Sequence, residues 1–136
     1  MLYSILIYDS EAVTDRLSKD EEASRVQQHV AMQEALEAEG RLGPVARLMP
    51  STAAVTLRPG TPGPGTPGPG TEKPLVIDGP FAETKEQLLG FYLVECDSLQ
   101  EALDAAQRLP LESGSLEVRP VGWYKASALG ASGDTE

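Results

Sequence analysis

Residues 75–86 read LVIDGPFAETKE, and the strand-like run that opens this stretch stops on a carboxylate, Asp78. Gly79 and Pro80 then reverse the chain, because glycine accepts positive φ and proline fixes φ and removes a backbone donor. A second apolar run, residues 88–94, follows the turn. A carboxylate held at a strand end beside a rigid turn is typical of functional sites, but the same pattern also serves a turn alone. Both interpretations stay open at this point.

Upstream of this turn, the sequence predicts a strand at 2–8, a loop at 9–17 and then a long helix. Ser18 and Glu21 have the spacing of a capping box, and Gly40 is a natural stop just past the last turn. Apolar residues recur between these signals at helical spacing, namely Ala23, Val26, Val30, Met32 and Leu36. The helix is therefore expected to cover one face of a sheet.

The middle of the chain favours short strands around a low-complexity insertion. Residues 45–49 and 53–57 predict one long strand or two short strands around Pro50. The Pro/Gly-rich insertion at 59–73 contains the pentapeptide GTPGP twice. Its composition predicts a mobile, partly extended loop that replaces a hairpin turn before the strand at 74–78.

The C-terminal part repeats the alternation of strand and helix. A strand at 88–96 precedes a helix that Ser98 and Glu101 open with a second capping-box pattern and that Pro110 ends. A last strand is predicted at 115–121, and the polar tail at 127–136 is expected to be flexible.

This order of elements predicts an α+β fold. Two helices between strands of an antiparallel sheet match the ferredoxin-like (split βαβ) arrangement, in which both helices cover one face. We expect a single domain over residues 1–126. The other face is predicted to carry Val55, Leu57, Val76 and Leu93, and in so short a chain its economical cover is a second copy of the same sheet. A homodimer is therefore expected.

Composition narrows the classes of function. The chain has 136 residues and a formal net charge of −10, which disfavours nucleic-acid and anionic membrane partners. No basic leader, cleavage site or membrane span is apparent, so the cytoplasm is the expected location. The single cysteine, Cys96, lies in an apolar run and is interpreted as structural. One histidine among scattered carboxylates lacks the spacing of a metal site, and no cofactor motif is present, so we expect neither metal nor cofactor.

A resemblance adds to these patterns. The segment DGPFAETKEQ at 78–87, followed by Gly90-Phe91-Tyr92, resembles the signature of the DGPF-type branch of the YCII-related family. The opening YSILIY at 3–8, the helix segment HVAM at 29–32 and the closing GSLEVRPV at 114–121 are also similar to that branch. The resemblance implies a ferredoxin-like fold that pairs into a dimeric α+β barrel. It also implies small-molecule chemistry with a histidine and an aspartate, and a connection to extracytoplasmic-function sigma factors.

His29 and Asp78 are the candidate catalytic residues. The helical wheel places His29 within the apolar arc, where it is either a core histidine with one hydrogen bond or a general acid/base that faces a cavity. Asp78 is either a turn residue or the carboxylate that orients the imidazole of His29. If the two touch, the expected chemistry is proton transfer on a small organic molecule, such as elimination, isomerisation or hydrolysis.

The remaining candidates surround this pair. Phe81 and Glu83 are the candidate substrate-binding residues, although Phe81 also suits an apolar gap and Glu83 a solvated charge. Residues 84–88 predict a single helical turn. Trp123 and Tyr124 are expected at an interface or a pocket wall. The sequence thus leaves three hypotheses: a small-molecule enzyme, a non-catalytic ligand-binding or regulatory module linked to a sigma factor, and a purely structural role for the signature.

Overall fold

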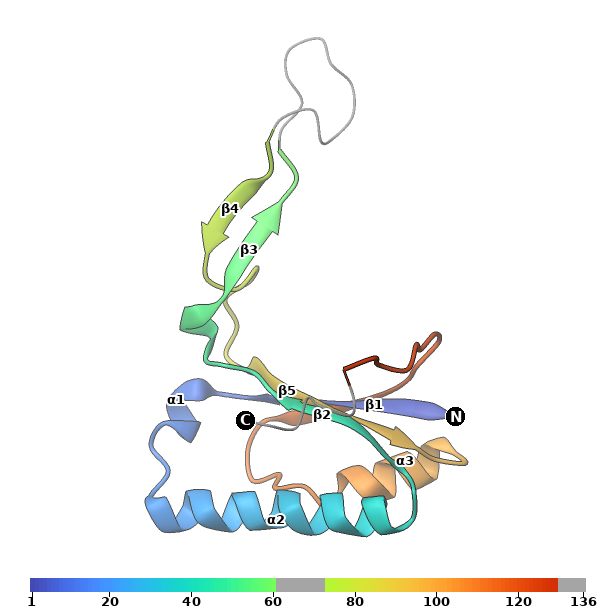
Figure 1. Ribbon diagram of the computed structural model, residues 1–136. Coiled ribbons are helices and arrows are strands. Elements are labelled where there is room, and N and C mark those ends of the chain that lie inside the picture. The colour runs from blue at the N-terminus through green and yellow to red at the C-terminus, as the bar shows by residue number, and fades with distance from the viewer. Residues whose placement is uncertain (61–72, 130–136) are drawn as a thin grey trace.

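The computed structural model describes residues 1–60 and 73–129, and its main body is one antiparallel sheet covered by helices (Figure 1). The sheet contains four strands in the order β2-β5-β1-β6. Their bounds are Leu2–Asp9 for β1, Leu42–Arg47 for β2, Gln87–Glu95 for β5 and Ser115–Pro120 for β6. The two central strands are not neighbours in the chain, as the predicted split βαβ arrangement requires. The fold is α+β, and its strand order agrees with a ferredoxin-like topology.

Helices α2 (Lys19–Ala38) and α3 (Leu99–Ala106) lie on the same face of this sheet (Figure 1). The predicted capping box of α2 is confirmed, because the Ser18 side chain accepts from the Glu21 amide and the Glu21 carboxylate accepts from the Ser18 amide. Gly40, at φ 70°, ends the helix in the left-handed conformation. In α3 only half of the predicted box forms, since the Glu101 carboxylate accepts from the Asp97 amide instead.

The core lies between the helices and the central strands. Tyr3 and Ile5 of β1 and Tyr92 and Val94 of β5 alternate toward the helices, as the two-residue period of a strand requires. The small side chains of α3 that face the sheet allow the helix to approach it closely, namely Ala102, Ala105 and Ala106. Leu109, just after the helix, is buried in the same core. Cys96 is buried in the same cluster, as its position in an apolar run predicts.

Helix α2 packs unevenly along its length. Met32 and Leu36 are buried in the core, whereas Val26 and Val30, which precede them on the helix, stay 49% and 41% exposed. The predicted apolar face is therefore buried only in part. The side chains of Val26 and Val30 instead line the cavity in which the candidate site lies.

Strands β3 (Val55–Arg58) and β4 (Leu75–Asp78) form a separate two-stranded sheet that projects from the main body (Figure 1). The short helical turn η1 (Ser51–Ala53) separates β2 from β3, so the two-strand alternative around Pro50 is the correct one. Our placement of Val55, Leu57 and Val76 on the second face of the main sheet is wrong. These side chains lie on the projecting hairpin, where they are exposed.

The segment between the hairpin and β5 also differs from the prediction. Residues 84–88 form no helical turn: the Thr84 hydroxyl bonds to the Glu86 carbonyl, and Gln87 already belongs to β5. A short helix not predicted, α1 (Glu11–Thr14), instead occupies the loop after β1. Most of the predicted insertion at 59–73 and of the tail at 127–136 lies outside the described residues.

Candidate functional site

A cavity of about 480 Å³ lies between residues 22–33 of α2 and the edge of the sheet where β2 pairs with β5. Apolar and polar side chains share its wall. Among the residues that line it are Val26, His29, Val30 and Gln33 from α2, Val45 and Arg47 from β2, and Gly90 and Tyr92 from β5. A mostly apolar pocket with a few convergent polar groups, large enough for a small organic molecule, is the usual form of a ligand site.

Gly90 explains why the cavity stays open next to β5. The residue is buried and alternates with Tyr92 and Val94 toward the helices, so a side chain here would enter the cavity. A Cβ atom at Gly90 would also collide with the carbonyl oxygen of Ala46 on β2. Glycine therefore permits the close approach of β2 and leaves the floor of the cavity empty.

His29 meets a buried tyrosine in this wall. Its Nδ1 lies 2.7 Å from the hydroxyl of Tyr92, a side chain only 1% exposed, and the two rings stack with centroids 5.8 Å apart. Gln33, one turn further along α2, donates its side-chain amide to the same hydroxyl at 2.9 Å. A buried tyrosine needs a partner for its hydroxyl, and here two residues of α2 provide it.

Burial and nearby charge keep the His29 ring neutral. Desolvation is the main cause that lowers the pKa of His29, and the positive charges of Arg47 and Arg25 lower it further. Burial also raises the pKa of Tyr92, against a smaller opposite effect of the hydrogen bond from Gln33. Both groups are therefore uncharged near neutral pH, so the imidazole has a nitrogen lone pair with which to accept a proton.

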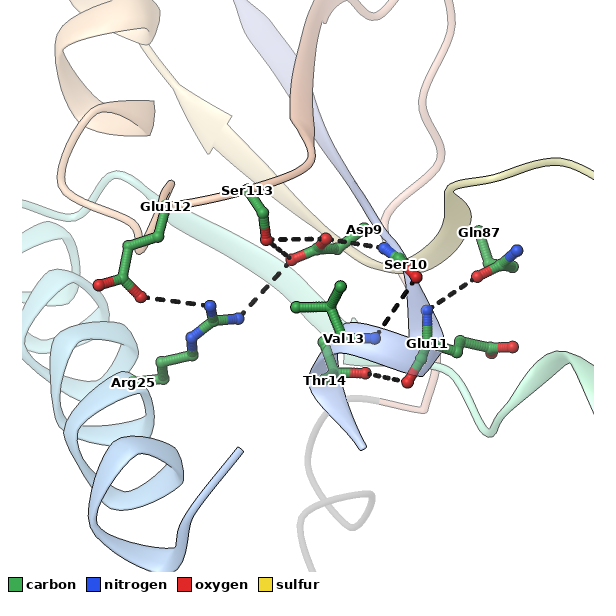
Figure 2. Close-up of polar contacts among 9 residues, drawn as sticks. All are labelled: Asp9, Ser10, Glu11, Val13, Thr14, Arg25, Gln87, Glu112 and Ser113. Carbon is green, nitrogen blue, oxygen red and sulfur yellow. Dashed lines mark hydrogen bonds and ion pairs between the residues drawn. The ribbon is translucent and has the colours of Figure 1, made fainter. Parts of the chain in front are cut away.

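A second cluster of polar side chains is built on Asp9 (Figure 2), and it reaches the cavity through Arg25. Asp9 is the last residue of β1, and its side chain is buried: the residue is only 6% exposed. Its Oδ1 accepts from the Ser10 amide at 2.7 Å, and the Ser113 hydroxyl lies 3.1 and 3.0 Å from its two oxygens. Arg25 completes the cluster at 3.7 Å from Asp9 and 3.2 Å from Glu112.

Arg25 links the two parts of the site. It lies one helical turn before His29 on α2, so both side chains share one face of the helix. A smaller cavity of about 70 Å³ borders Asp9, Arg25, His29 and Ser113 together. This volume holds roughly two water molecules, so solvent has room between the carboxylate and the imidazole.

Gly114 allows the residues next to it to pack closely against the end of β1. Its φ is 80°, and a Cβ atom there would collide with the Tyr8 carbonyl oxygen and lie 2.8 Å from Cγ of Asp9. The absence of a side chain lets the start of β6 approach β1. That approach brings Ser113 over a residue 104 positions away in the chain.

The other predicted site residues lie elsewhere in the single chain. Asp78, Phe81 and Glu83 are exposed, and none of the three lines either cavity described above. Phe81 is 78% exposed at the base of the hairpin, where its carbonyl accepts from Arg58. Of the predicted residues, the fold thus brings His29 into the cavity and leaves the Asp78 turn outside it.

Trp123 and Tyr124, expected at an interface or a pocket wall, are exposed after β6 in the single chain. Within residues 1–60 and 73–129, no three His, Cys, Asp or Glu side chains gather in a metal-binding cluster. No helix in this part of the chain is long and apolar enough to cross a membrane.

Comparison with known proteins identifies the family. The model of the YCII-related domain matches residues 1–124. The chain belongs to the YCII-related family. A similar relative, described as "Uncharacterized protein R00369" from Rhizobium meliloti (strain 1021), is 48% identical over 132 residues, which cover 95% of this chain and 98% of the relative. Its name assigns no activity.

Four residues at the site of this YCII-related chain were not predicted from the sequence: Asp9, Arg25, Gln33 and Tyr92. A signal for Tyr92 was present, because the alternation from Gly90 through Tyr92 to Val94 turns its hydroxyl toward the helix that carries His29. Arg25 was also detectable, as a charged residue one turn before the histidine on the same face. Nothing local identified Asp9, because its burial depends on Ser113 and Gly114 from the other end of the chain.

Proposed function

We propose that this YCII-related protein is a small-molecule enzyme in which His29 transfers protons at the wall of the 480 Å³ cavity. The observation that carries the proposal is the placement of the chain's single histidine, hydrogen-bonded to a buried tyrosine in a pocket of ligand size. The reaction class is proton transfer on a small organic molecule, in an elimination, isomerisation or hydrolysis.

The hydrogen bond to Tyr92 supports both directions of proton transfer. When Nδ1–H donates to the Tyr92 oxygen, Nε2 carries the lone pair and acts as a base. The imidazolium that results then acts as the acid, because it can return the proton from Nε2. Gln33 donates to the same oxygen, which holds the Tyr92 hydroxyl in place during both steps. Tyr92 and Gln33 are therefore positioning residues in this proposal.

Asp9 is the carboxylate that we propose behind the histidine, and Arg25, whose own charge opposes an imidazolium, is its ion-pair partner. An imidazolium that forms during the reaction is stabilised by a nearby carboxylate. Asp9 serves this role through the small cavity that it shares with His29, and its bonds to Ser10 and Ser113 hold it rigidly. Arg25 balances the charge of Asp9 in the resting state.

Asp78 enters the proposal through a second copy of the chain. The β3–β4 hairpin exposes five apolar side chains, which are Val55, Leu57, Leu75, Val76 and Ile77. Such a surface favours burial against a partner, and the economical partner is another copy. In a homodimer the hairpin of one copy would carry Asp78, Phe81 and Glu83 toward the cavity of the other. The resemblance of the Asp78 turn to the DGPF-type signature supports this placement.

Proton transfer is tested on a panel of small lactones and enolisable ketones, followed by NMR in deuterated water. We expect turnover or deuterium incorporation for at least one compound, and a loss of about 10²–10⁴-fold in His29→Ala. Val30→Trp, which fills the cavity from a partly exposed position, should also abolish turnover, while Ala31→Trp on the outer side of α2 should not. Equal rates in wild type and His29→Ala for every compound would refute the enzyme.

The alternative is a non-catalytic ligand-binding or regulatory module that uses the same cavity. It predicts a compound whose binding Val30→Trp abolishes and which the protein leaves unchanged. A pull-down with an extracytoplasmic-function sigma factor encoded nearby tests its regulatory form. Association at micromolar concentration that depends on the ligand would favour the module over the enzyme.

A further inference from the structure

Two arginines line the cavity of His29 in a protein that is strongly acidic. The chain carries a formal net charge of −10, yet Arg25 and Arg47 both line the cavity. Asp15 and Glu22 are the acidic members of its wall. The distribution of these four charges around His29 therefore decides which ligands the cavity prefers.

The cationic side chains dominate the end of the cavity where His29 lies. Arg47 and Arg25 both lower the pKa of His29, whereas neither Asp15 nor Glu22 is among the causes of that shift. Electrostatic effects on a pKa decline with distance, so the arginines are the charges that the imidazole senses most. The imidazole thus responds to the two arginines of the wall rather than to its two carboxylates.

The two arginines differ in how their charge is balanced. Arg25 pairs with Asp9 and with Glu112, so most of its charge is matched inside the protein. Arg47 makes no ion pair with any residue in 1–60 or 73–129. It lies on the edge strand β2, opposite Gly90, and two positions beyond Val45, which faces Tyr92 across the strands. Its guanidinium is therefore available at the cavity wall.

We propose that the cavity takes a small organic carboxylate, with the carboxylate against Arg47 and the carbon skeleton between the valines of α2 and the ring of Tyr92. A guanidinium offers a planar pair of donors that matches a carboxylate. Val26 and Val30 provide apolar surface for the skeleton, and His29 then meets the carbon or oxygen next to it. The inference rests on the proposed function, because it names the substrate class of the same site.

The test compares benzoate with benzamide, which share ring and size but differ in charge. Binding is measured by calorimetry at low ionic strength, and the His29 ring resonances report whether the ligand occupies the cavity. We expect benzoate to bind about tenfold more tightly than benzamide, which corresponds to one charge-assisted hydrogen-bonded contact. Arg47→Ala should remove this ratio, and Arg108→Ala, an exposed arginine that does not line the cavity, should preserve it.

Separate outcomes distinguish this inference from the proposed function. If both compounds shift the His29 resonances with equal affinity and Val30→Trp abolishes both, the cavity is a small-molecule site and the preference for carboxylates is wrong. An unchanged ratio in Arg47→Ala would also overturn the inference, because the preference would then arise elsewhere. If neither compound perturbs His29, both the carboxylate site and its use by the proposed enzyme are contradicted.

Discussion

Asp9 and Asp78 look alike in the sequence and differ in the fold. Each is the last residue of a strand, and each is followed by a short segment that turns the chain. Asp9 is buried, accepts bonds from Ser10 and Ser113 and pairs with Arg25, whereas Asp78 is exposed on a projecting hairpin. A carboxylate at a strand end becomes part of a rigid site only when distant segments cover it.

Substitution of the glycine beside each aspartate should give the largest difference in the free energy of unfolding between the two regions. Gly114 and Gly79 both have positive φ, but a Cβ atom at Gly114 would collide with β1 while one at Gly79 meets nothing within 4 Å. We expect Gly114→Ala to lower the free energy of unfolding by about 3 kcal/mol, from backbone strain and overpacking together. Gly79→Ala should cost about 1 kcal/mol, from strain alone. Urea unfolding of both variants measures the difference, and equal costs would contradict the steric role of Gly114.

Local patterns predicted most of the main sheet. The capping box at Ser18, the stop at Gly40 and the strands that became β1, β5 and β6 were readable because short-range signals determine them. The sequence did not predict that β3 and β4 form a sheet of their own. Apolar strands give the same period-2 signal whether they join a large sheet or a small one, so the pattern in β3 and β4 left their sheet unspecified.

The candidate site was readable only where one element contains the signal. His29 was detectable from the helical wheel of α2, whose residues Val26 and Val30 line the same cavity. Asp9 could not be found, because its neighbours come from residues 113–114, and no local rule places these against the end of β1. The turn at Asp78 was predicted as a site because its carboxylates, its rigid turn and its aromatic residue all lie within one short segment.

Removal of the two carboxylates, one at a time, should give the second-largest difference in the free energy of unfolding. Asp9→Ala leaves the Ser113 hydroxyl without its acceptor and leaves Glu112 as the remaining ion-pair partner of the partly buried Arg25. We expect a loss of about 2–3 kcal/mol in the free energy of unfolding, as for other buried polar networks. Asp78→Ala should stay within about 0.5 kcal/mol of wild type, because surface substitutions rarely exceed this. Thermal or urea unfolding tests both values, at protein concentrations too low for the proposed dimer to form.

Acidification should act through His29 on the same region. Burial lowers the pKa of His29 in the folded chain below its ordinary value of 6.5, so the unfolded chain binds the proton more readily. The stability that the neutral ring contributes is therefore present above pH 6.5 and is lost as the pH falls through the folded-state pKa. His29→Gln should flatten this part of the stability profile. A wild-type profile that stays level between neutral and mildly acidic pH would contradict the lowered pKa.

The smallest effect uses His29 as a probe that compares the two carboxylates directly. Asp9→Asn removes one of the two ion-pair partners of Arg25, so the guanidinium, left with Glu112 alone, should lower the pKa of His29 further at every protein concentration. Asp78→Asn should lower the same pKa only where the chain is dimeric, because in the proposed homodimer Asp78 reaches the cavity from the other copy. NMR titration of the single histidine, at low and high protein concentration, measures both shifts. If Asp78→Asn leaves the titration unchanged at both concentrations, Asp78 does not belong to the site, and Asp9 is the carboxylate that serves His29.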